Sequence, residues 1–286
     1  MKNNFLLRLS MTKGIGAVAK QRIYQFAKRH QWWQFDSLEI RLLAQTTRKN
    51  DWNDWSEERL CEIQQTHHYV TIEDSTYPEQ LRHVPTPPLV LFYKGELAFL
   101  ERKMLAVVGA RDASQYGYSV LQELMPELIK RNFVIVSGLA RGIDSFAHQF
   151  AISNQGKTIG IVGTGLDICY PKGSGNLQIE MSKHHLVVSE YPNGTTPAKF
   201  HFPMRNRIIA GLSSGVLVIE AKKRSGSLIT AQQALDYGKE VFVVPGSILD
   251  GRSSGCHQLI QDGAVCVEKA QDIFDCYDLL NKFAKP

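Results

Sequence analysis

From about residue 103 onward, the sequence predicts an α/β fold with a doubly wound, mostly parallel sheet. Short runs rich in Val and Ile recur there and alternate with stretches of helical periodicity. The runs are hydrophobic almost throughout, which is typical of strands buried on both faces. Strand–helix alternation of this kind joins parallel strands through right-handed crossovers. The first ~80 residues instead show helical periodicity, which predicts a small all-helical domain in front of the sheet.

Length and composition fit a globular protein of two domains. The chain has 286 residues, of which 43% are hydrophobic and 21% charged. No apolar run reaches the ~18 residues of a membrane-spanning helix. The first residues are interrupted by Arg8 and do not form a signal peptide. We therefore expect a cytoplasmic protein without membrane insertion.

The first helices surround a glycine turn. Leu6 and Leu9 indicate one short helix and the run Ala17–Phe26 a second, with Gly14-Ile15-Gly16 between them. Such turns occur in helix-hairpin-helix DNA modules, where backbone amides contact a phosphate, but they also serve as tight connections without a ligand. Five aromatic residues either fill a small core or offer stacking surfaces for bases, and core is the more frequent use: Trp32, Trp33, Phe35, Trp52 and Trp55.

A proline-rich stretch predicts the domain boundary. Tyr77-Pro78 and Pro85-Thr86-Pro87-Pro88 block the continuation of a helix. We therefore expect a helical domain over residues 1–75 and an α/β domain over residues 76–286. Leu89–Tyr93 is a candidate strand near the start of the second domain.

The main strands of the predicted sheet come next in order. They are Met104–Val108, Phe133–Val136, Thr158–Val162, Leu186–Val188, Val216–Ile219, Val241–Val244 and Ala264–Val267. In a doubly wound sheet, ligands bind outside the carboxyl ends of the strands. The residues directly after these runs are therefore the first candidates for a binding site.

Six loops with glycines and cations come after these runs. They begin Gly109-Ala110-Arg111, Ser137-Gly138-Leu139-Ala140-Arg141-Gly142, Gly163-Thr164-Gly165, Ser189-Glu190-Tyr191, Lys222-Lys223-Arg224-Ser225 and Pro245-Gly246-Ser247. Glycine lets a ligand approach the backbone, and the free amides at the start of the next helix attract anions. Several cations along one edge suit a ligand with several phosphates better than a ligand with one.

The positive charge of the chain is concentrated in one segment. The net charge is only +5. Residues 199–224 hold six basic residues and one acidic residue, whereas residues 1–80 hold 11 basic and 10 acidic residues. The excess of cations is therefore local and belongs to the predicted sheet domain.

Motifs of several cofactor-dependent and catalytic classes are absent from the sequence. There is no Gly-x-x-x-x-Gly-Lys-Ser/Thr for ATP, and Arg111 stands where a dinucleotide site needs close backbone approach. Neither Gly-x-Ser-x-Gly nor His-Glu-x-x-His occurs. The five cysteines are widely spaced, which indicates reduced thiols and no metal site. We expect no cofactor and no intrinsic ATPase activity.

Three carboxylates at strand ends, Asp144, Asp167 and Glu190, are candidate catalytic groups. The alternative is that these carboxylates only stabilise the fold, and their neighbouring residues favour this interpretation. Asp144 precedes Ser145, near which a helix starts, and can cap that helix. Glu190 can pair with a nearby arginine.

The segment Met204–Leu212 predicts a helix at the rim of a cleft. Met204, Ile208 and Leu212 are four residues apart and form one apolar stripe. At ~100° per residue, Arg205 and Arg207 flank that stripe and Asn206 points away from it. We therefore expect both arginines to present guanidinium groups to phosphates without holding up the fold. The aromatic rings of Phe200 and Phe202, just before, can pack the helix start or stack on a base.

Six ordered motifs resemble those of the DNA-processing protein A family (DprA, also called Smf). They are Ser137–Asp144, Gly163–Asp167 with Tyr170-Pro171, Ser189–Tyr191, Phe202–Gly211, Arg224–Thr230 and Val244–Ser247. Residues 75–270 carry the resemblance, and the N-terminal region is similar in kind to the family's SAM-like or helix-hairpin-helix-like domain. The resemblance implies an extended Rossmann-like fold for the sheet domain.

The resemblance also implies a function without enzymatic activity. Family members bind single-stranded DNA, protect strands imported during natural transformation, and load the RecA recombinase onto them. Many members carry a C-terminal winged-helix domain, which we do not expect here. From the loops and the resemblance together we expect DNA contacts at Gly109, Arg111, Ser137, Gly138, Arg141, Gly142, Gly163, Gly165, Lys199, Phe202, Arg205, Asn206, Arg207, Lys222, Arg224 and Ser225.

The family also implies a homodimer formed through the Rossmann-like domain. Leu259, Ile260 and Val265 supply apolar surface near the end of the predicted sheet, and we expect them at the interface. The alternative is that the last helix covers the edge strand of the sheet.

The competing function is that of a nucleotide phosphoribohydrolase of the lysine-decarboxylase-like fold. That group carries Pro-Gly-Gly-x-Gly-Thr loops. Here Pro245-Gly246-Ser247-Ile248 lacks the second glycine and the Gly-Thr pair. The departure counts against hydrolysis of a glycosidic bond.

Overall fold

The computed structural model describes the backbone of residues 1–283 and the side chains of residues 1–279. Residues 284–286, which we assigned to the α/β domain, lie outside the described residues. The helices are α1 (Lys2–Met11), α2 (Ala17–His30), α3 (Ser37–Ala44), η1 (Trp52–Asp54), α4 (Glu57–Thr66), α5 (Glu79–Arg82), η2 (Leu97–Glu101), α6 (Gln115–Lys130), α7 (Ile143–Ser153), η3 (Lys172–Ser174), α8 (Gly175–His184), α9 (His201–Leu212), α10 (Gly226–Asp236), α11 (Ser254–Gln261) and α12 (Ala270–Phe283). The strands are β1 (Tyr69–Thr71), β2 (Val90–Gly95), β3 (Met104–Gly109), β4 (Val134–Ser137), β5 (Thr158–Val162), β6 (Leu186–Ser189), β7 (Gly215–Ile219), β8 (Glu240–Val243) and β9 (Val265–Cys266).

All nine strands form one sheet in the order β1-β2-β6-β5-β4-β3-β7-β8-β9. The pairs from β6 to β9 are parallel, whereas β1–β2 and β2–β6 are antiparallel. The mostly parallel, doubly wound sheet is therefore confirmed, and each predicted run contributes a strand. The edge strand β1 differs from expectation, because it lies in the part of the chain predicted to be helical throughout.

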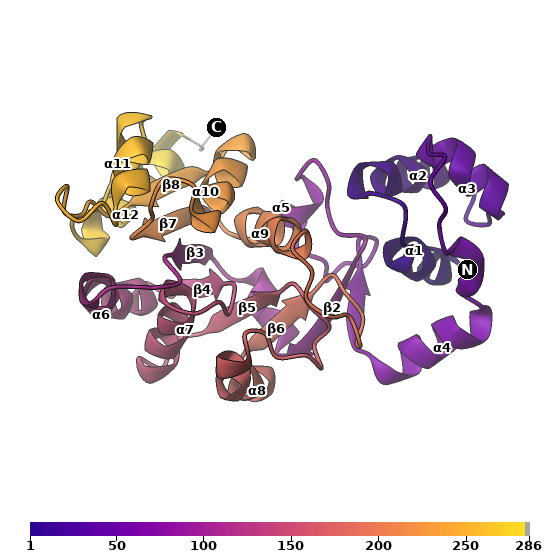
Figure 1. Ribbon diagram of the computed structural model, residues 1–286, viewed down its shortest axis with the longest axis horizontal. Coiled ribbons are helices and arrows are strands. Elements are labelled where there is room, and N and C mark those ends of the chain that lie inside the picture. Colours follow the sequence, from indigo (N-terminus) through magenta and orange to yellow (C-terminus); the bar gives the residue numbers. More distant parts are fainter. Residues whose placement is uncertain (284–286) are drawn as a thin grey trace.

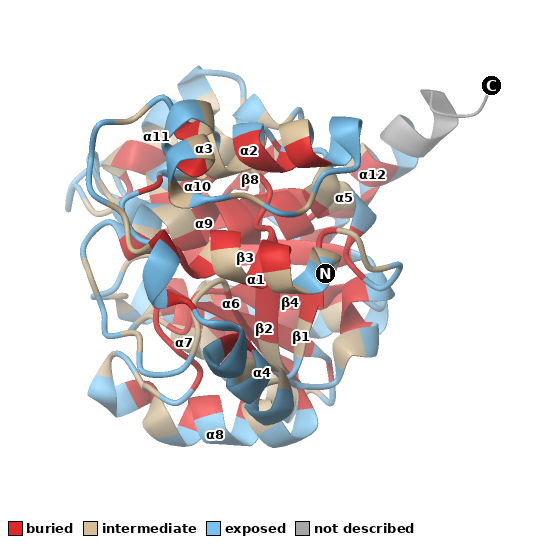
Figure 2. Ribbon diagram, turned by 90° about the vertical axis from the view of Figure 1, so that its right-hand side faces the viewer, coloured by how far each residue is buried: buried red, intermediate tan, exposed pale blue. Residues whose placement is uncertain are grey.

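Helices cover both faces of the sheet (Figure 1). The helices α6, α7 and α8 lie on one face, and α5, α9 and α10 lie on the other. Alternate residues of β3 serve the two layers: Met104 and Ala106 belong to one apolar cluster, and Leu105 and Val107 to the other. Figure 2 shows the resulting buried sheet with exposed outer faces on α4 and α8.

The helical N-terminal part packs around its tryptophans. Trp52 and Trp55 are buried, and Trp33 and Phe35 pack against the same apolar cluster, whereas Trp32 is 50% exposed. The core interpretation is therefore confirmed for four of the five aromatic residues. The predicted glycine turn does connect α1 to α2, with Gly14 in the left-handed region at φ +83°.

An acidic residue after β1 anchors this helical part to the sheet. Glu73 forms ion pairs with Lys2 of α1 and with Lys28 of α2, the latter at 2.8 Å. The hydroxyl of Tyr24, also on α2, donates a hydrogen bond to Glu73. Although burial alone would raise it, these contacts lower the pKa of Glu73 to about 2.

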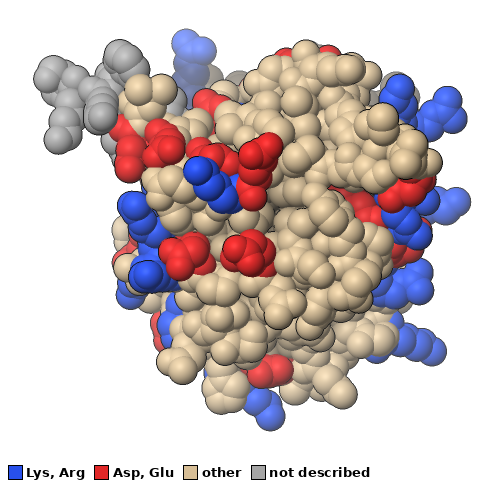
Figure 3. Space-filling view, turned by 90° about the vertical axis from the view of Figure 1, so that its left-hand side faces the viewer, with Lys and Arg blue, Asp and Glu red and all other residues tan. Residues whose placement is uncertain are grey.

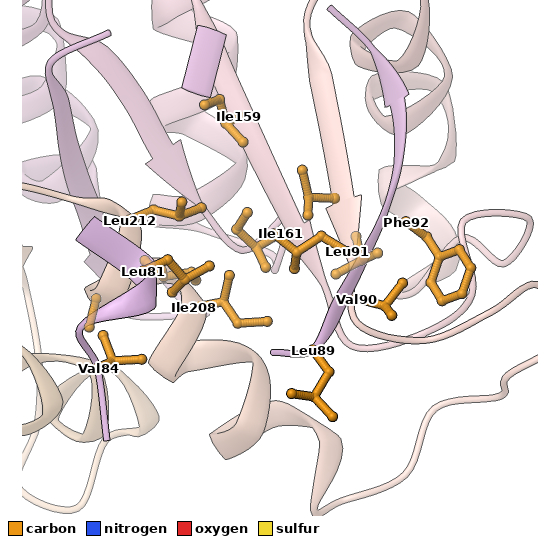
Figure 4. Packing of buried hydrophobic residues seen from close by; sticks show 14 of the residues in the cluster. Leu81, Val84, Leu89, Val90, Leu91, Phe92, Ile159, Ile161, Ile208 and Leu212 are labelled. Carbon is orange, nitrogen blue, oxygen red and sulfur yellow. The ribbon is translucent and has the colours of Figure 1, made fainter. Parts of the chain in front are cut away.

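Helix α9 is enclosed by the rest of the α/β domain. It contacts α5 and α10 as well as β3, β4 and β5. Figure 4 shows Ile208 and Leu212 of this helix beside Leu81 of α5. At the end of α9, the Lys239 ammonium donates to the carbonyl oxygens of Ala210, Gly211 and Ser213. Such a cation satisfies the carbonyl groups that a helix end leaves free.

Neither a membrane-spanning helix nor a metal cluster is found in the described part of the chain. No helix within residues 1–283 is long and apolar enough to cross a membrane. Among the described side chains, no three His, Cys, Asp or Glu residues lie close enough together to hold a metal ion. The five cysteines are free thiols.

Candidate nucleic-acid interface

A pocket of about 350 Å³ lies at the carboxyl ends of β4 and β5, beside the start of α9. We call it the strand-end pocket. Its lining comes from four segments that are far apart in the sequence: Arg111, then Gly138, Ala140 and Arg141, then Val162, Gly163, Thr164, Tyr170, Pro171 and Gly173, and finally Phe202 and Arg205. Hollows of about 420 and 400 Å³ beside α10 and before α11 are larger, but each is lined by only one cation, Arg224 or Arg252. Of these three cavities, only the strand-end pocket is lined by three cations.

Arg205 lies at the base of the pocket and is held by backbone carbonyls. Its Nη1 donates to the carbonyl oxygen of Gly138 and, at 2.7 Å, to that of Ile161. Its Nε donates to Oδ1 of Asn206 at 3.1 Å. Nη2 has no hydrogen-bond partner among the described residues, although Arg205 lines the pocket. One guanidinium nitrogen therefore stays available for a ligand.

The expectation that Arg205 and Arg207 lie at the surface without holding up the fold, and that Asn206 points away from the core, is wrong. Their relative exposures are 5%, 9% and 3%, whereas Met204 of the supposed core stripe is only half-buried. The physical reason is the enclosure of α9 by α5, α10 and the sheet, which leaves no outward side for these residues. Arg205 and Arg207 therefore support the fold.

Arg207 belongs to a buried ion pair away from the strand-end pocket. Its Nη2 lies 2.5 Å from Oε1 of Glu190, which confirms the structural role expected for that carboxylate. Its Nε and Nη1 are buried without a partner among the described residues. Asn206 donates to the carbonyl oxygen of Gly226 at 3.3 Å and thereby ties α9 to α10.

Asp144 is buried beside the pocket and does not act as the helix cap we expected. It lies in the first turn of α7, and its Oδ2 accepts a hydrogen bond from the amide of Gly138 at 3.1 Å. Burial raises the pKa of Asp144, while Arg205 and the loop amides oppose that rise. Asp167, the third candidate, accepts the amide of Gly194 at 2.9 Å. All three carboxylates thus have structural partners.

Gly138 and Gly142 are required by the close approach of the loops. A Cβ on Gly138 would lie 1.8 Å from Nη1 of Arg205, so a side chain there would displace the guanidinium. Gly142 has φ +74°, and a Cβ there would lie 2.2 Å from the carbonyl oxygen of Ala110. These contacts bring the loop after β4 against the loop that carries Arg111.

Aromatic rings form one wall of the pocket. The rings of Tyr170 and Phe202 lie 5.5 Å apart at an interplanar angle of 35°. The guanidinium of Arg111 lies 5.8 Å from the centre of the Phe202 ring. Phe202 therefore contacts both a second ring and a cation. Phe200 is 68% exposed, although it lies just before α9.

The structure brings together six of the sixteen expected DNA contacts in the strand-end pocket: Arg111, Gly138, Arg141, Gly163, Phe202 and Arg205. Lys199 is exposed just before α9, while Gly109 and Gly165 fit tightly against backbone atoms of the chain. The hydroxyl of Ser137 donates to the carbonyl oxygen of Val107 at 2.6 Å, a buried structural bond.

Three further expected residues lie beside α10, outside the pocket. Lys222 is 3.7 Å from Asp112, Ser225 caps α10, and Arg224 lines a separate hollow together with Ser225. Three of the expected cations thus line the pocket and two lie beside α10, whereas Lys199 precedes α9 and Arg207 is buried against Glu190.

Six residues that line the pocket were missing from the expected contacts: Ala140, Val162, Thr164, Tyr170, Pro171 and Gly173. Tyr170-Pro171 could have been found, because it comes after β5 in a motif already noticed in the sequence. Ala140 and Val162 carry no chemical signal, since their place in the lining comes only from the packing of the loops.

Comparisons with known proteins agree with this architecture. The family model for DNA recombination-mediator protein A matches residues 68–278. The DNA processing protein DprA of Streptococcus pneumoniae is 52% identical over 203 residues, which cover 71% of this chain and 72% of that protein. DprA of Bacillus subtilis is 46% identical over 207 residues, or 72% of this chain and 70% of that protein.

Solved structures give the same result. The X-ray structure of S. pneumoniae DprA superposes with a TM-score of 0.87 at 40% identity, covering 95% of this chain and 97% of that one. A structure of Helicobacter pylori DNA processing protein A, described for its single-stranded DNA binding mode, gives a TM-score of 0.66 at 29% identity over 76% of this chain and 98% of that one. The chain therefore belongs to the DNA recombination-mediator protein A family, the DprA/Smf family.

Proposed function

We propose that this protein binds single-stranded DNA in the strand-end pocket and acts as a DNA-processing protein without catalytic activity. The observation that carries the proposal is the convergence of Arg111, Arg141 and Arg205 on a pocket with an aromatic wall. Cations neutralise phosphates, and rings stack on bases of any sequence, which is the combination that single-strand binders use. The description of the H. pylori relative supports the same ligand.

The geometry favours a single strand over a duplex. A pocket of about 350 Å³ admits a base that is unstacked from its neighbours, and bases in a duplex are not free to enter. Duplex readers place an exposed helix in the major groove. Helix α9 carries Arg205 of this site, but it is buried on nearly all sides and cannot serve in that way.

One contact disfavours the competing hydrolase function. It lies between β3 and β7, where the order of the strands in the sheet reverses. There the carboxylate of Glu220 accepts hydrogen bonds from the amide and hydroxyl of Ser114, at 2.9 and 2.8 Å, at the start of α6. This helix start is the place where a mononucleotide phosphate binds in such sheets. Because a carboxylate already occupies it, we infer that the protein uses no nucleotide cofactor. Release of base from nucleoside monophosphates would favour the hydrolase instead.

Membership of the family suggests a fate for the bound strand and a dimeric protein. We propose that the strand is protected during natural transformation and passed to the RecA recombinase.

Our proposed dimer interface comprises Leu259 and Ile260 on α11 and Val265 on the edge strand β9, all of which are partly buried. Figure 3 shows that the face at the α6, α11 and α12 end carries Asp and Glu side chains among uncharged areas, with most Lys and Arg near its margins. A face with carboxylates and few central cations suits a protein partner better than the phosphates of DNA.

Fluorescence anisotropy with labelled oligo(dT) and with a duplex of equal length tests the proposal. We expect tighter binding of the single strand, and an affinity that falls with salt by ~0.7 in log–log slope per phosphate neutralised. Equal affinity for the two ligands at moderate salt would contradict it.

Arg111→Ala should weaken oligo(dT) binding by about tenfold or more, since a charge-assisted contact contributes about 1.5–3 kcal/mol. Lys183→Ala is the matched control, because Lys183 is exposed in the last turn of α8, at the opposite edge of the sheet. The control should bind as the parent does.

A further inference from the structure

Tyr170 presents an aromatic ring to solvent at the edge of the strand-end pocket. The residue is 44% exposed although it lines the pocket and contacts Phe202. A large ring that is left half bare has unused stacking surface.

The loop that carries Tyr170 is fixed on both sides of it. Before it, the hydroxyl of Thr164 donates to the carbonyl oxygen of Ile168 at 3.1 Å, and the Ile168 amide donates to Gly165 at 3.0 Å. After it, the Ser174 amide donates to Pro171 at 2.9 Å, and the Ser174 hydroxyl donates to the carbonyl oxygen of Leu139 at 3.1 Å. The exposure of Tyr170 is therefore built into an anchored loop.

The surroundings of the ring identify its ligand chemistry. The ring of Phe202 packs against that of Tyr170 at 5.5 Å, and the guanidinium of Arg111 lies 5.8 Å from the centre of the Phe202 ring. Two more cations, Arg141 and Arg205, line the same pocket. A ligand that satisfies both features has a planar ring and a phosphate close to each other, as each nucleotide of a single strand does.

We propose that Tyr170 is the stacking platform for one base that is turned out of the single strand while the neighbouring phosphates contact the pocket cations. The inference rests on the proposed function and adds a requirement to it: the strand must offer an unstacked base at this position. A ring platform does not read hydrogen-bonding edges, so the base can be any of the four. An oligomer of the same length and charge but without bases lacks this contact.

The experiment compares Tyr170→Ala with Tyr170→Phe, each titrated with oligo(dT) and with an abasic oligomer of equal length and charge. Stacking on a base contributes enough that Tyr170→Ala should lose roughly fivefold to a hundredfold in affinity for oligo(dT). Tyr170→Phe keeps the ring and should bind oligo(dT) as the parent does. Neither variant should change the affinity for the abasic oligomer. Tyr118→Ala is the control, because this half-exposed tyrosine packs on Phe146 and Phe150 and lines none of the three hollows named above.

Each outcome decides the inference. An equal loss for oligo(dT) and for the abasic oligomer would mean that Tyr170 only shapes the pocket, and no loss for either would mean that it has no role. If Tyr170→Ala melts at a lower temperature than the parent, Tyr170→Leu replaces it, since leucine fills space without an aromatic face. The proposed function fails separately, namely if the unmodified protein does not prefer oligo(dT) to duplex.

Discussion

Arg205→Ala should destabilise the protein strongly, because the arginine is part of the buried structure. The substitution removes the donor to the carbonyl oxygens of Gly138 and Ile161 and takes away a positive charge that opposes the burial-raised pKa of Asp144. Arg205 is 5% exposed, so water cannot readily replace the lost contacts. The expectation from the sequence was the opposite, that the arginine could be removed with little effect on melting.

The magnitude can be worked out from these contacts. A buried acceptor left without a donor costs about 1–3 kcal/mol, and Arg205→Ala leaves two such acceptors, the carbonyl oxygens of Gly138 and Ile161. The two lost hydrogen bonds together should lower the free energy of unfolding by about 2–6 kcal/mol. For a domain of roughly 150–250 residues, 1 kcal/mol lowers the melting temperature by about 2–4 °C. Arg205→Ala should therefore melt roughly 5 °C or more below the parent.

Differential scanning calorimetry measures this shift, with Arg111→Ala as the exposed-arginine control. The control should melt within a few degrees of the parent, because an unpaired surface arginine contributes little to stability. Adding Asp144→Asn to Arg205→Ala should restore part of the loss, since the unpaired buried carboxylate is then gone. A melting temperature for Arg205→Ala within about 2 °C of the parent would refute the reasoning.

Three further positions, Gly138, Glu73 and Ile260, can be tested directly by substitution. Gly138→Ala should lower both the melting temperature and the affinity for oligo(dT), because its Cβ would lie 1.8 Å from Nη1 of Arg205; a variant that melts and binds as the parent does would contradict this contact. The folded-state pKa of Glu73 is lowered from 4.5 to about 2, so its stabilising contribution is present above pH ~4.5 and is lost as the pH falls toward 2. Glu73→Gln should reduce that pH dependence in thermal melts between pH 5 and about 2.5, and an unchanged dependence would show that other groups cause it. Ile260→Glu should convert a homodimer to a monomer in light scattering at micromolar concentration, whereas a parent that is already monomeric would contradict the interface.

The strands were predictable because their signal is local. Continuous Val and Ile runs such as Val134–Val136 and Val216–Ile219 are hydrophobic on both faces, and the structure buries them on both faces. Strand β1 was missed because Tyr69–Thr71 has only three residues, and its strand character comes from pairing with β2. Pairing between two separate segments of the chain cannot be predicted from the periodicity of either segment alone.

The site was predictable where its residues come directly after a strand. Arg111 and Gly163 were found because the sheet fixes their positions at its carboxyl edge. The arginines of α9 were misjudged because a helical wheel with one apolar stripe assumes that its other sides face water. The approach of α5 and α10 buries those sides, and polar residues became buried partners of backbone groups and of Glu190.

The central claim, that a single strand lies in the strand-end pocket, is tested most directly by photocrosslinking. Oligo(dT) with 4-thiothymidine in place of some thymidines would be bound, irradiated and digested with the protein, and the crosslinked peptides identified by mass spectrometry. We predict crosslinks within the segments that line the pocket, residues 109–112, 138–142, 163–173 and 199–205, and their loss in Arg111→Ala at the same concentrations. Crosslinks confined to the helical residues 1–66 or to the α11–α12 end would contradict the account.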